Sequence, residues 1–407
     1  MLMNSFTKSD FHVFQANSGL VYLDSSATQQ KPLAVLERVE RYYREENANP
    51  LRGLYELGVK ATEAYENARE AVRKFIGAKS VREIVFTRNA TESLNLIAYS
   101  WGRSNIGEGD EVLVAISEHH SDLLPWQTLC KEKGAELKYL ECGKSGRYTE
   151  EALRDALSER TKLFCIAQIS NVFGRLNPIK RFAEICRENG TLIVCDAAQS
   201  APHIAVDVQK LGVDFLAFSG HKMLAPMGIG VLYGREELLE SMPPFLYGGE
   251  MIDTVTRCGA SFAELPHKFE AGTVNAGGAV GLHAAIDYIS ELGLDEIERR
   301  EEKLTALAFG EMKKIPHVNI IGADDPQEHH GILTFTVDGV HPHDIAAIFD
   351  AENIAVRAGH HCAQPLFHFL GIPSAARMSL AFYNDEEDIM RFIAVLKTLR
   401  RRMGYDG

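Results

Sequence analysis

Short apolar runs that end in polar residues recur along most of this chain. They read EIVFT, DEVLVA, TKLFCIA, TLIVCD, VDFLAFS and GIGVLYG, in that order. Runs of this length, bounded by polar turns, predict buried strands. Between them lie segments with apolar residues at helical spacing, such as residues 58–76 and IKRFAEICRENG. This alternation, from about residue 20 to about residue 290, predicts an α/β fold with a mostly parallel sheet covered on both faces.

The pattern changes in the last part of the chain. Residues 248–275 have scattered aromatic residues and no clear period, which fits a hairpin arm or a long loop; such segments are usually functional or lie at an interface. A helical segment over about residues 280–312 is interrupted near Gly293. The rest of the chain indicates an α+β unit. It contains the run HGILTFTVDG, a helix around HPHDIAAIFDAE, the strand NIAVRAG and a terminal amphipathic helix. We therefore predict a large domain over residues 20–290 and a smaller domain formed by residues 1–19 and 291–407.

Composition narrows the class of protein. The chain has 407 residues, of which 45% are hydrophobic and 24% charged, as in ordinary globular proteins. A net charge of −13 disfavours nucleic-acid binding. The N-terminus lacks the pattern of a signal peptide, and no apolar run is long enough to span a membrane. Seven scattered cysteines without a CxxC pair predict a reducing compartment, the cytoplasm, and argue against a disulfide framework or a zinc ribbon.

Two of the predicted strands end in groups that suit pyridoxal phosphate. TLIVCD ends in Asp196, and VDFLAFS is followed by His221 and Lys222. Reactive groups of an open α/β sheet gather past the carboxyl ends of its strands, so this pair is expected at one crevice. A Lys can form a Schiff base with the cofactor, and an Asp can keep its pyridine nitrogen protonated. By itself the pair also fits a common strand end and a solvated loop lysine.

Two further strand ends add candidate binding groups. EIVFT runs into residues 87–91 and then a helix, and a strand-to-helix turn leaves free N–H groups that suit a phosphate. Many α/β crossovers share this turn without binding anything. DEVLVA is followed by His119 and His120, which would emerge over the crevice or cap a helix at the surface.

The C-terminal region contributes a thiol and a guanidinium. Cys362, in RAGHHCAQP, follows two histidines and precedes Pro365, which predicts an exposed loop instead of a core position. A metal site formed by His360, His361 and Cys362 with either His119 or His120 is disfavoured, because three successive residues rarely point at one ion. A structural cysteine remains an alternative. Arg377, beside a short apolar strand, suits capture of a carboxylate, although a structural ion pair would look the same.

These motifs together resemble a known family. Five motifs occur in the order found in cysteine desulfurases of the class V aminotransferase family, which have PLP fold type I. They are EHHSDLLPWQ, DAAQSAPH, SGHKMLAPMGIG, FEAGTVN and RAGHHCAQP. They resemble the second group of these enzymes, which includes the desulfurase of the Suf iron–sulfur assembly system and the selenocysteine lyases. The resemblance covers nearly the whole chain and implies a PLP-dependent transferase fold.

The resemblance implies a role for each matching residue. Lys222 matches the lysine that carries pyridoxal phosphate, Asp196 the partner of the pyridine nitrogen, and Gln199 a contact of the ring hydroxyl. His119 matches a histidine stacked on the ring. The matches to phosphate contacts are Ala90, through its backbone N–H, Thr91, Ser219, His221 and, from the neighbouring subunit of a homodimer, Thr273. Asn171 and Arg377 match residues that bind the substrate carboxylate, and Arg357 lies close to them. Cys362 matches the thiol that receives sulfur.

The implied activity is conversion of L-cysteine to L-alanine, with sulfur carried as a persulfide on Cys362 and supplied to iron–sulfur cluster assembly. The implied partners are L-cysteine, with L-selenocysteine as a second candidate, and a sulfur-acceptor protein of the SufE or SufU kind. Another class V enzyme, such as an aminotransferase or a kynureninase-like lyase, and a sulfur-relay scaffold are the alternatives. Three positions depart from the family pattern: Leu51 and Gln168 replace frequent histidines, and Ala90 replaces a frequent threonine.

Overall fold

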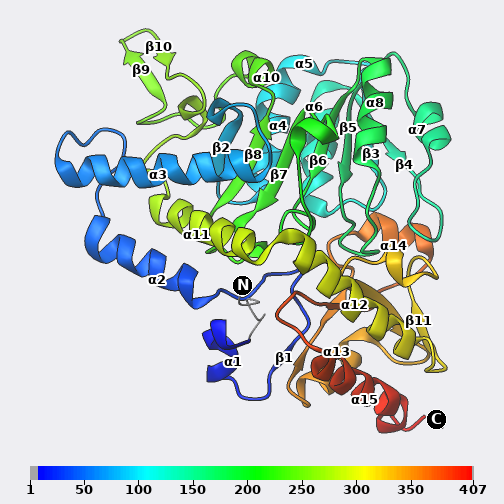
Figure 1. Cartoon of the computed structure of the whole chain (residues 1–407). Coiled ribbons are helices and arrows are strands. Elements are labelled where there is room, and N and C mark those ends of the chain that lie inside the picture. The colour runs from blue at the N-terminus through cyan, green and yellow to red at the C-terminus, as the bar shows by residue number, and fades with distance from the viewer. Residues whose placement is uncertain (1–7, 406–407) are drawn as a thin grey trace.

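A seven-stranded sheet forms the centre of the computed structural model, which describes residues 8–405 (Figure 1). The strands lie in the order β2 (Ile84–Thr87), β8 (Gly230–Gly234), β7 (Phe215–Ser219), β6 (Leu192–Asp196), β5 (Thr161–Ala167), β3 (Glu111–Ala115) and β4 (Glu136–Leu140). From β7 to β4 all neighbours are parallel, whereas β8 is antiparallel to both of its neighbours. The predicted α/β fold with a mostly parallel central sheet is confirmed.

Both faces of this sheet are buried, because successive side chains of a strand enter different apolar cores. Leu113 and Phe164 belong to one core, and Val112 and Cys165 belong to the other. Helices that contribute to the first core include α3 (Glu56–Phe75), α8 (Ile179–Asn189) and α11 (Ala276–Leu292). Those that contribute to the second include α4 (Ala90–Ile97) and α6 (Leu124–Lys133). Burial on both faces explains why the strands read as continuous apolar runs.

A second, antiparallel sheet lies in the C-terminal part of the chain, at the lower right of Figure 1. Its strands lie in the order β11 (Val318–Ile320), β12 (Ile332–Val337), β15 (Ala375–Ser379) and β14 (Arg357–Gly359). A separate apolar core joins it to α12 (Leu294–Met312), α13 (Pro342–Asp350) and α15 (Glu386–Arg402). The predicted interruption of the long helical segment is confirmed, since α11 ends and α12 begins on either side of Gly293, whose φ is 86°.

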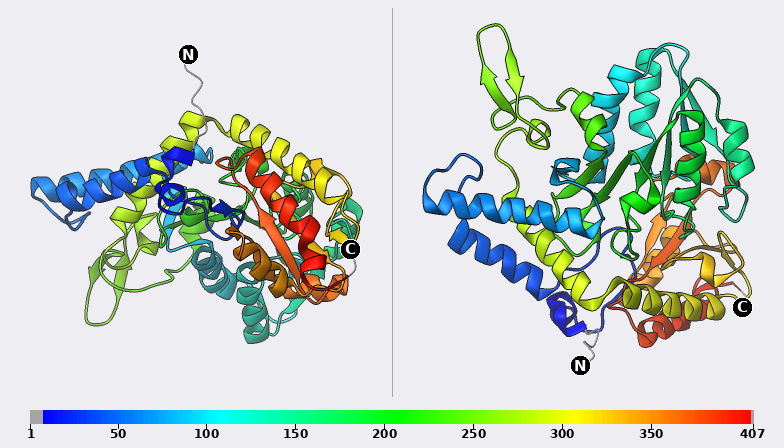
Figure 2. Two further views of the ribbon diagram at one scale, coloured as in Figure 1. Left: turned by 90° about the horizontal axis from the view of Figure 1, so that it is seen from below. Right: turned by 45° about the horizontal axis from the view of Figure 1, so that its top comes forward.

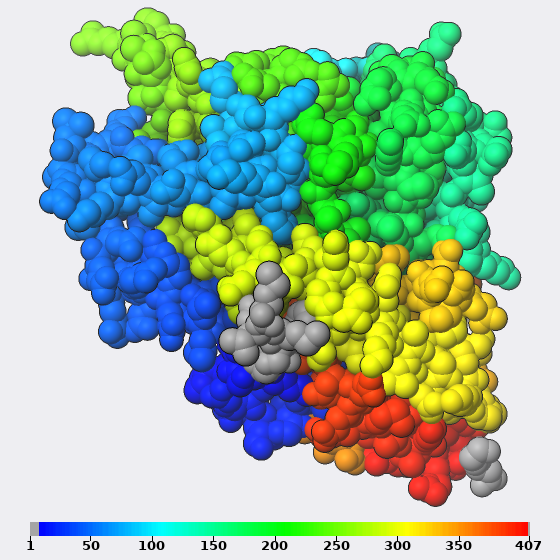
Figure 3. All heavy atoms as spheres, viewed as in Figure 1, coloured from blue at the N-terminus to red at the C-terminus, as the bar shows by residue number. Residues whose placement is uncertain are grey.

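The N-terminal segment packs against the C-terminal part. After α1 (His12–Ala16), β1 (Val21–Tyr22) pairs in parallel with β13 (Ile354–Ala355). The ring of Phe11 lies 5.0 Å from that of Tyr383, and Figure 3 shows the N-terminal segment beside the C-terminal helix. Residues 1–7 of the predicted small domain lie outside the described residues. The domain limits at residues 20 and 290 stay a prediction.

The irregular segment contains a hairpin arm. β9 (Ile252–Val255) and β10 (Ala260–Phe262) pair antiparallel and project from the body of the protein in both views of Figure 2. The chain that follows is anchored by Glu270, whose Oε1 accepts hydrogen bonds from the Arg69 Nη1 and the Phe86 N–H, both at 2.7 Å. Both charged side chains are buried, so this ion pair fixes where the FEAGTVN segment leaves the arm.

The remaining elements are short or peripheral. The other α-helices are α2 (Leu33–Arg41), α5 (Arg103–Asn105), α7 (Glu150–Ala156), α9 (Val208–Leu211), α10 (Glu236–Ser241) and α14 (Gln364–Leu370). Single 3-10 turns cover Lys8–Asp10, Val81–Glu83, His120–Asp122, Gly220–Lys222, His267–Phe269 and Pro326–Glu328, and π-helical turns cover Tyr42–Glu46 and Ala98–Gly102. Over residues 8–405, no helix combines the length and the apolar character that a membrane span requires.

Candidate active site

Asp196 and Lys222 meet at the carboxyl edge of the large sheet. Asp196 is the last residue of β6, and Lys222 closes the turn directly after β7. Because β6 and β7 are parallel neighbours, both residues emerge at the same edge. They line one cavity of about 280 Å³. The crevice expected from the sequence is therefore present.

The two groups influence each other's ionisation. Lys222 is buried, and burial lowers the pKa of its amine to about 8, although the charge of Asp196 opposes this shift. Burial raises the pKa of Asp196, against the effects of Lys222 and of the Ala198 N–H, which donates to Oδ1 at 2.8 Å. An amine with this pKa is partly neutral near physiological pH, which a nucleophile or a base requires.

One end of the cavity is built to receive an anion. The N-terminus of α4 points at it, with Asn89 as the capping residue. Ser219 accepts the Ala90 N–H through Oγ at 2.9 Å, and the Thr91 hydroxyl bonds that of Ser121 at 2.7 Å. His221 Nδ1 is buried and has no hydrogen-bond partner within the described part of the chain. A helix N-terminus, hydroxyl groups and an unpaired ring nitrogen suit a phosphate group.

His119 lines the cavity in a defined tautomer. Its Nδ1 accepts the Ser121 N–H at 3.1 Å, so the proton of the neutral ring is on Nε2. Burial, reinforced by Lys222, lowers the pKa of His119 to about 3, which keeps the ring neutral. Gln199, also on the cavity wall, donates its side-chain amide to the Ser26 carbonyl at 3.0 Å.

The opposite end carries two arginines. Arg377 is buried; its Nη1 donates to the Asn171 carbonyl at 2.8 Å, while its Nε has no partner among the described residues. Burial lowers the pKa of Arg377 to about 10, so the guanidinium is still charged at neutral pH. Arg357 binds the carboxylate of Asp24, with Nη2 and Oδ2 2.9 Å apart. Sequence reasoning missed Asp24, although it ends the run VYLD much as Asp196 ends TLIVCD.

Cys362 reaches the cavity on a strained loop between β14 and α14. His361 and Cys362 have φ values of 50° and 57°, in the left-handed region that costs non-glycine residues energy. Two hydrogen bonds fix the loop: the Asn171 amide donates to the His361 carbonyl and the His120 N–H to the Cys362 carbonyl, both at 2.7 Å. Cys362 is exposed and also lines the cavity, so the prediction of an exposed loop is confirmed.

The predicted site residues, with one exception, line this single cavity. They are Ala90, Thr91, His119, Asn171, Asp196, Gln199, Ser219, His221, Lys222, Arg357, Cys362 and Arg377. The exception is Thr273, which is exposed and lines a different groove with Gly228 and Asn275. The role of Thr273 in a neighbouring subunit stays a prediction.

Comparison with known proteins agrees with this arrangement. The model of the family described as "Aminotransferase class-V" matches residues 21–392. The chain belongs to this family. It is 49% identical to a protein of Halalkalibacterium halodurans named "Probable cysteine desulfurase", over 96% of this chain and 95% of the relative.

Two solved class V structures resemble the whole chain. An apo cysteine desulfurase from Thermococcus onnurineus NA1 has a TM-score of 0.94 and 40% identity, and the match covers 99% of each chain. The cysteine desulfurase CsdA of Escherichia coli, described as an S-sulfonic acid form, has a TM-score of 0.90 and 34% identity, over 97% of this chain and 98% of that chain. The family is PLP-dependent.

Two of the positions that depart from the class V pattern have local partners. Gln168 is buried; its Oε1 accepts the Ser200 hydroxyl at 2.7 Å, and its N–H donates to the Asp196 carbonyl at 2.9 Å. This residue therefore ties the end of β5 to the segment after Asp196. Leu51 lies outside the cavity, with a φ of 74° and its N–H bonded to the Thr62 hydroxyl.

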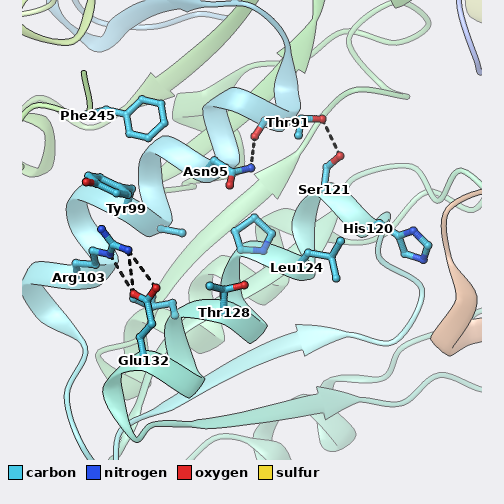
Figure 4. A pocket seen from close by; sticks show the side chains of 13 residues that line it. Thr91, Asn95, Tyr99, Arg103, His120, Ser121, Leu124, Thr128, Glu132 and Phe245 are labelled. Atoms are coloured by element: carbon cyan, nitrogen blue, oxygen red, sulfur yellow. Dashed lines mark hydrogen bonds and ion pairs between the residues drawn. The ribbon is translucent and has the colours of Figure 1, made fainter. Parts of the chain in front are cut away.

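A larger groove of about 450 Å³ adjoins the class V site (Figure 4). It shares Thr91 and Ser121 with the cavity and is otherwise lined by the Arg103–Glu132 ion pair and by aromatic residues, including Tyr99. The described residues on its walls include neither a lysine nor a cysteine. The reactive groups are therefore confined to the smaller cavity. Within residues 8–405, no cluster of three or more His, Cys, Asp or Glu is placed to hold a metal ion.

A pair of buried acids lies behind Asp196. Glu118 accepts the Ala167 N–H at 2.9 Å, and Asp122 accepts the Trp126 indole N–H at 3.0 Å. The second oxygen of each carboxyl group has no hydrogen-bond partner within residues 8–405, and the negative charges of the two groups repel each other. Burial and mutual repulsion raise the pKa of Glu118 well above its ordinary range, so the pair holds a proton. His119 lies between these two residues in the chain.

We expect the Asp122→Asn variant to lose part of the pH dependence of folding. The raised pKa of Glu118 means that the folded protein keeps a proton that the unfolded chain releases above about pH 4, so stability declines as the pH rises. One such proton changes the free energy of unfolding by about 1.4 kcal/mol per pH unit. An amide at position 122 removes the repulsion from Asp122, which lowers the pKa of Glu118 and reduces this contribution.

Urea unfolding at several pH values between about 5 and 8 measures the effect. The Asp155→Asn variant, which changes an exposed carboxylate on α7, is the control and should keep the slope of the unmodified protein. An unchanged slope in the Asp122→Asn variant would show that Asp122 does not raise the pKa of Glu118.

Proposed function

We propose that this chain is a cysteine desulfurase, which converts L-cysteine to L-alanine and receives the sulfur on Cys362. The observation that carries this proposal is that one cavity is lined by a buried amine, its carboxylate partner and an exposed thiol: Lys222, Asp196 and Cys362. Other class V chemistry needs the first two groups and has no use for the third. Relatives that match the chain over nearly its whole length and carry the same name support the proposal.

The residues of the cavity fit pyridoxal phosphate. The amine of Lys222 can hold the aldehyde carbon, and the carboxylate of Asp196 can hold the pyridine nitrogen. The α4 N-terminus, Ser219 and the unpaired His221 Nδ1 suit the phosphate. When bound, the cofactor withdraws electrons from the Cα of the amino acid and so makes its proton acidic. His119, neutral and half-buried, borders the same space and can offer its ring to the cofactor.

Arg377 and Asn171 are placed to orient the substrate. The charged Arg377 lines the cavity and suits the α-carboxylate, with which a guanidinium forms directed, charge-assisted hydrogen bonds. Asn171 borders the same space. With the carboxylate held there, the Cα proton is presented to Lys222, whose lowered pKa of about 8 suits a base near physiological pH.

The sulfur-transfer step belongs to Cys362. Its thiolate attacks the sulfur of L-cysteine, so that an S–S bond forms as the substrate Cβ–S bond breaks. The product carbon skeleton takes up a proton and leaves as L-alanine, and Cys362 retains the sulfur as a persulfide. His119, which lines the cavity and carries its proton on Nε2, can assist the departing group.

The persulfide defines the partners we propose. Because Cys362 is exposed, a sulfur-acceptor protein of the SufE or SufU kind can reach it and carry the sulfur to iron–sulfur cluster assembly. L-selenocysteine, whose selenium leaves more easily, is a second candidate substrate. We also propose a cytoplasmic location, where a free reactive thiol persists.

We further propose a homodimer. Thr273 is exposed at a groove on the surface of the protein. The arm and its surroundings expose apolar side chains, including Leu246, Tyr247, Val255 and Phe262. Exposed apolar groups gathered in this way are typical of a protein interface. In a dimer, Thr273 of one subunit would complete the phosphate end of the other.

Product analysis tests the proposed function. Purified protein reconstituted with pyridoxal phosphate and given L-cysteine with a thiol reductant is expected to yield alanine and sulfide in equal amounts. A class V aminotransferase would instead yield a keto acid and require a second amino acid or keto acid. A kynureninase-like lyase would act on a different carbon skeleton, and a sulfur-relay scaffold would form no alanine. Formation of a keto acid in place of alanine, or no alanine at all, would overturn the proposal.

A further inference from the structure

Lys31 places an ammonium group beside the turn that carries Lys222. Its Nζ donates to the His221 carbonyl at 3.0 Å, to the Thr28 hydroxyl at 3.2 Å and to the Gln29 carbonyl. No carboxylate of the described chain pairs with it, and burial lowers its pKa to about 8, so the amine is mostly charged at pH 7. A half-buried cation among neutral acceptors loses part of its hydration without an ion pair that would offset the cost.

Three donors converge on the carbonyl of His221. Besides the Lys31 ammonium, it accepts the Thr28 hydroxyl and the Gln29 N–H, both at 3.1 Å. A carbonyl oxygen has two lone pairs, so its capacity to accept is fully used. The Tyr22 hydroxyl in turn donates to the Thr28 carbonyl at 2.8 Å. The fold therefore fixes the charge of Lys31 next to His221.

The side chains at the phosphate end of the cavity supply no net positive charge among the described residues. They are hydroxyl groups at the N-terminus of α4 and the ring of His221. This ring is neutral, because burial and the charges of Lys222 and Lys31 lower its pKa to about 4. Arg88 and Glu92, at the start of α4, pair with each other at 3.0 Å and cancel. A phosphate brings a charge of about −1.5 to −2 at pH 7, which these groups leave unbalanced.

The other ionisable groups of the cavity wall have different roles in the proposed reaction. Lys222 bonds the aldehyde carbon, and Asp196 holds the pyridine nitrogen. The substrate and sulfur steps use Arg357, Arg377 and Cys362. The remaining two histidines of the wall are neutral, because burial lowers the pKa of each to about 3.

The charge of Lys31 acts where the phosphate is expected. It disfavours a proton on the His221 ring, and the same Coulomb interaction favours a negative charge beside that ring. His221 Nδ1 is buried and has no partner within residues 8–405, which suits a phosphate oxygen. We propose that Lys31 is a positioning residue, which supplies the counter-charge of the cofactor phosphate from outside the cavity wall. This inference rests on the proposed function, because it concerns the cofactor of the same reaction.

Binding of pyridoxal phosphate and of pyridoxal tests the proposal without turnover. Both carry the same ring and aldehyde, and only the first carries a phosphate. The full-length protein, freed of cofactor, is titrated with each, and equilibrium dialysis gives both dissociation constants. In Lys31→Gln, which keeps a donor but loses the charge, we expect the preference for pyridoxal phosphate over pyridoxal to fall about tenfold. Lys31→Arg should restore it. A merely structural role for Lys31 would weaken both ligands alike, and an unchanged ratio overturns the proposal.

Lys268→Gln is the matched control. Lys268 is also a buried lysine that donates to a backbone carbonyl, that of Glu240 at 2.9 Å, but it lies outside the cavity. This variant should keep the preference of the unmodified protein, and an equal fall in both variants would overturn the proposal.

The unmodified protein supplies a second test if Lys31→Gln does not fold. Between about pH 7 and pH 10 Lys31 loses its proton, so the preference for pyridoxal phosphate should fall about tenfold. Lys222 also titrates there but bonds both ligands, while His221 and Tyr22 stay neutral. A constant preference overturns the proposal. Failure of the proposed function has a different signature, since the unmodified holoenzyme would then form no alanine from L-cysteine.

Discussion

The Lys222→Ala variant is expected to form alanine from L-cysteine on the order of 10⁴-fold more slowly than the unmodified protein. Lys222 has two roles in the proposed reaction, as the residue that carries the cofactor and as the base at Cα. Its burial and the lowering of its pKa to about 8 prepare the amine for both. Initial rates of alanine release measure the loss.

The covalent role of Lys222 has its own measurement. After reduction with borohydride, the peptide that contains Lys222 should gain the mass of the cofactor in the unmodified protein, and no peptide should gain it in the variant. Lys268 offers a matched control, because it is also buried but donates to the Glu240 carbonyl outside the cavity. Lys268→Ala should retain both the labelled peptide and the activity. Labelled cofactor or near-normal turnover in Lys222→Ala would contradict the assignment.

The Cys362→Ser variant is expected to bind the cofactor and L-cysteine normally but to release alanine on the order of 10³-fold more slowly. A hydroxyl is a far weaker acceptor for sulfur than a thiolate, so the Cβ–S bond is left without its nucleophile. L-selenocysteine should remain a substrate, because selenium leaves more readily. The two substrates compared on one variant therefore separate loss of sulfur transfer from loss of structure.

Cys258→Ser is the matched control for this experiment. Cys258 is the other exposed cysteine of the described chain and lies between β9 and β10, outside the cavity. Its loss should leave both activities unchanged. Normal alanine release from L-cysteine by Cys362→Ser would remove Cys362 from the mechanism.

The sequence alone was sufficient to predict the site residues that lie at the ends of strands. Asp196, Lys222 and His119 each follow an apolar run, and the carboxyl ends of parallel strands converge whatever the details of packing. Cys362 could be placed on an exposed loop because of its neighbours in RAGHHCAQP. The resemblance to a family added assignments that periodicity could not supply, such as Gln199 and Asn171, which the structure places on the same cavity wall.

Groups that depend on contacts distant in sequence were not predictable. Asp24 pairs with an arginine 333 residues away, and nothing in VYLDSS marks that partner. The raised pKa values of Glu118 and Asp122 also escape a sequence pattern, because they depend on how deeply folding buries the two carboxyl groups. Thr273 could be named from resemblance, but a single chain does not carry it into the cavity.

Peptide mass spectrometry after exposure to L-cysteine tests the central claim most directly, because it asks whether the amine of the large sheet and the thiol of the C-terminal region act on one molecule. The holoenzyme, without reductant or acceptor protein, should gain one sulfur atom on Cys362 for each alanine formed, and Lys222→Ala should gain none. Alanine formation with Cys362 unmodified, or with the sulfur on Cys258 instead, would contradict the account.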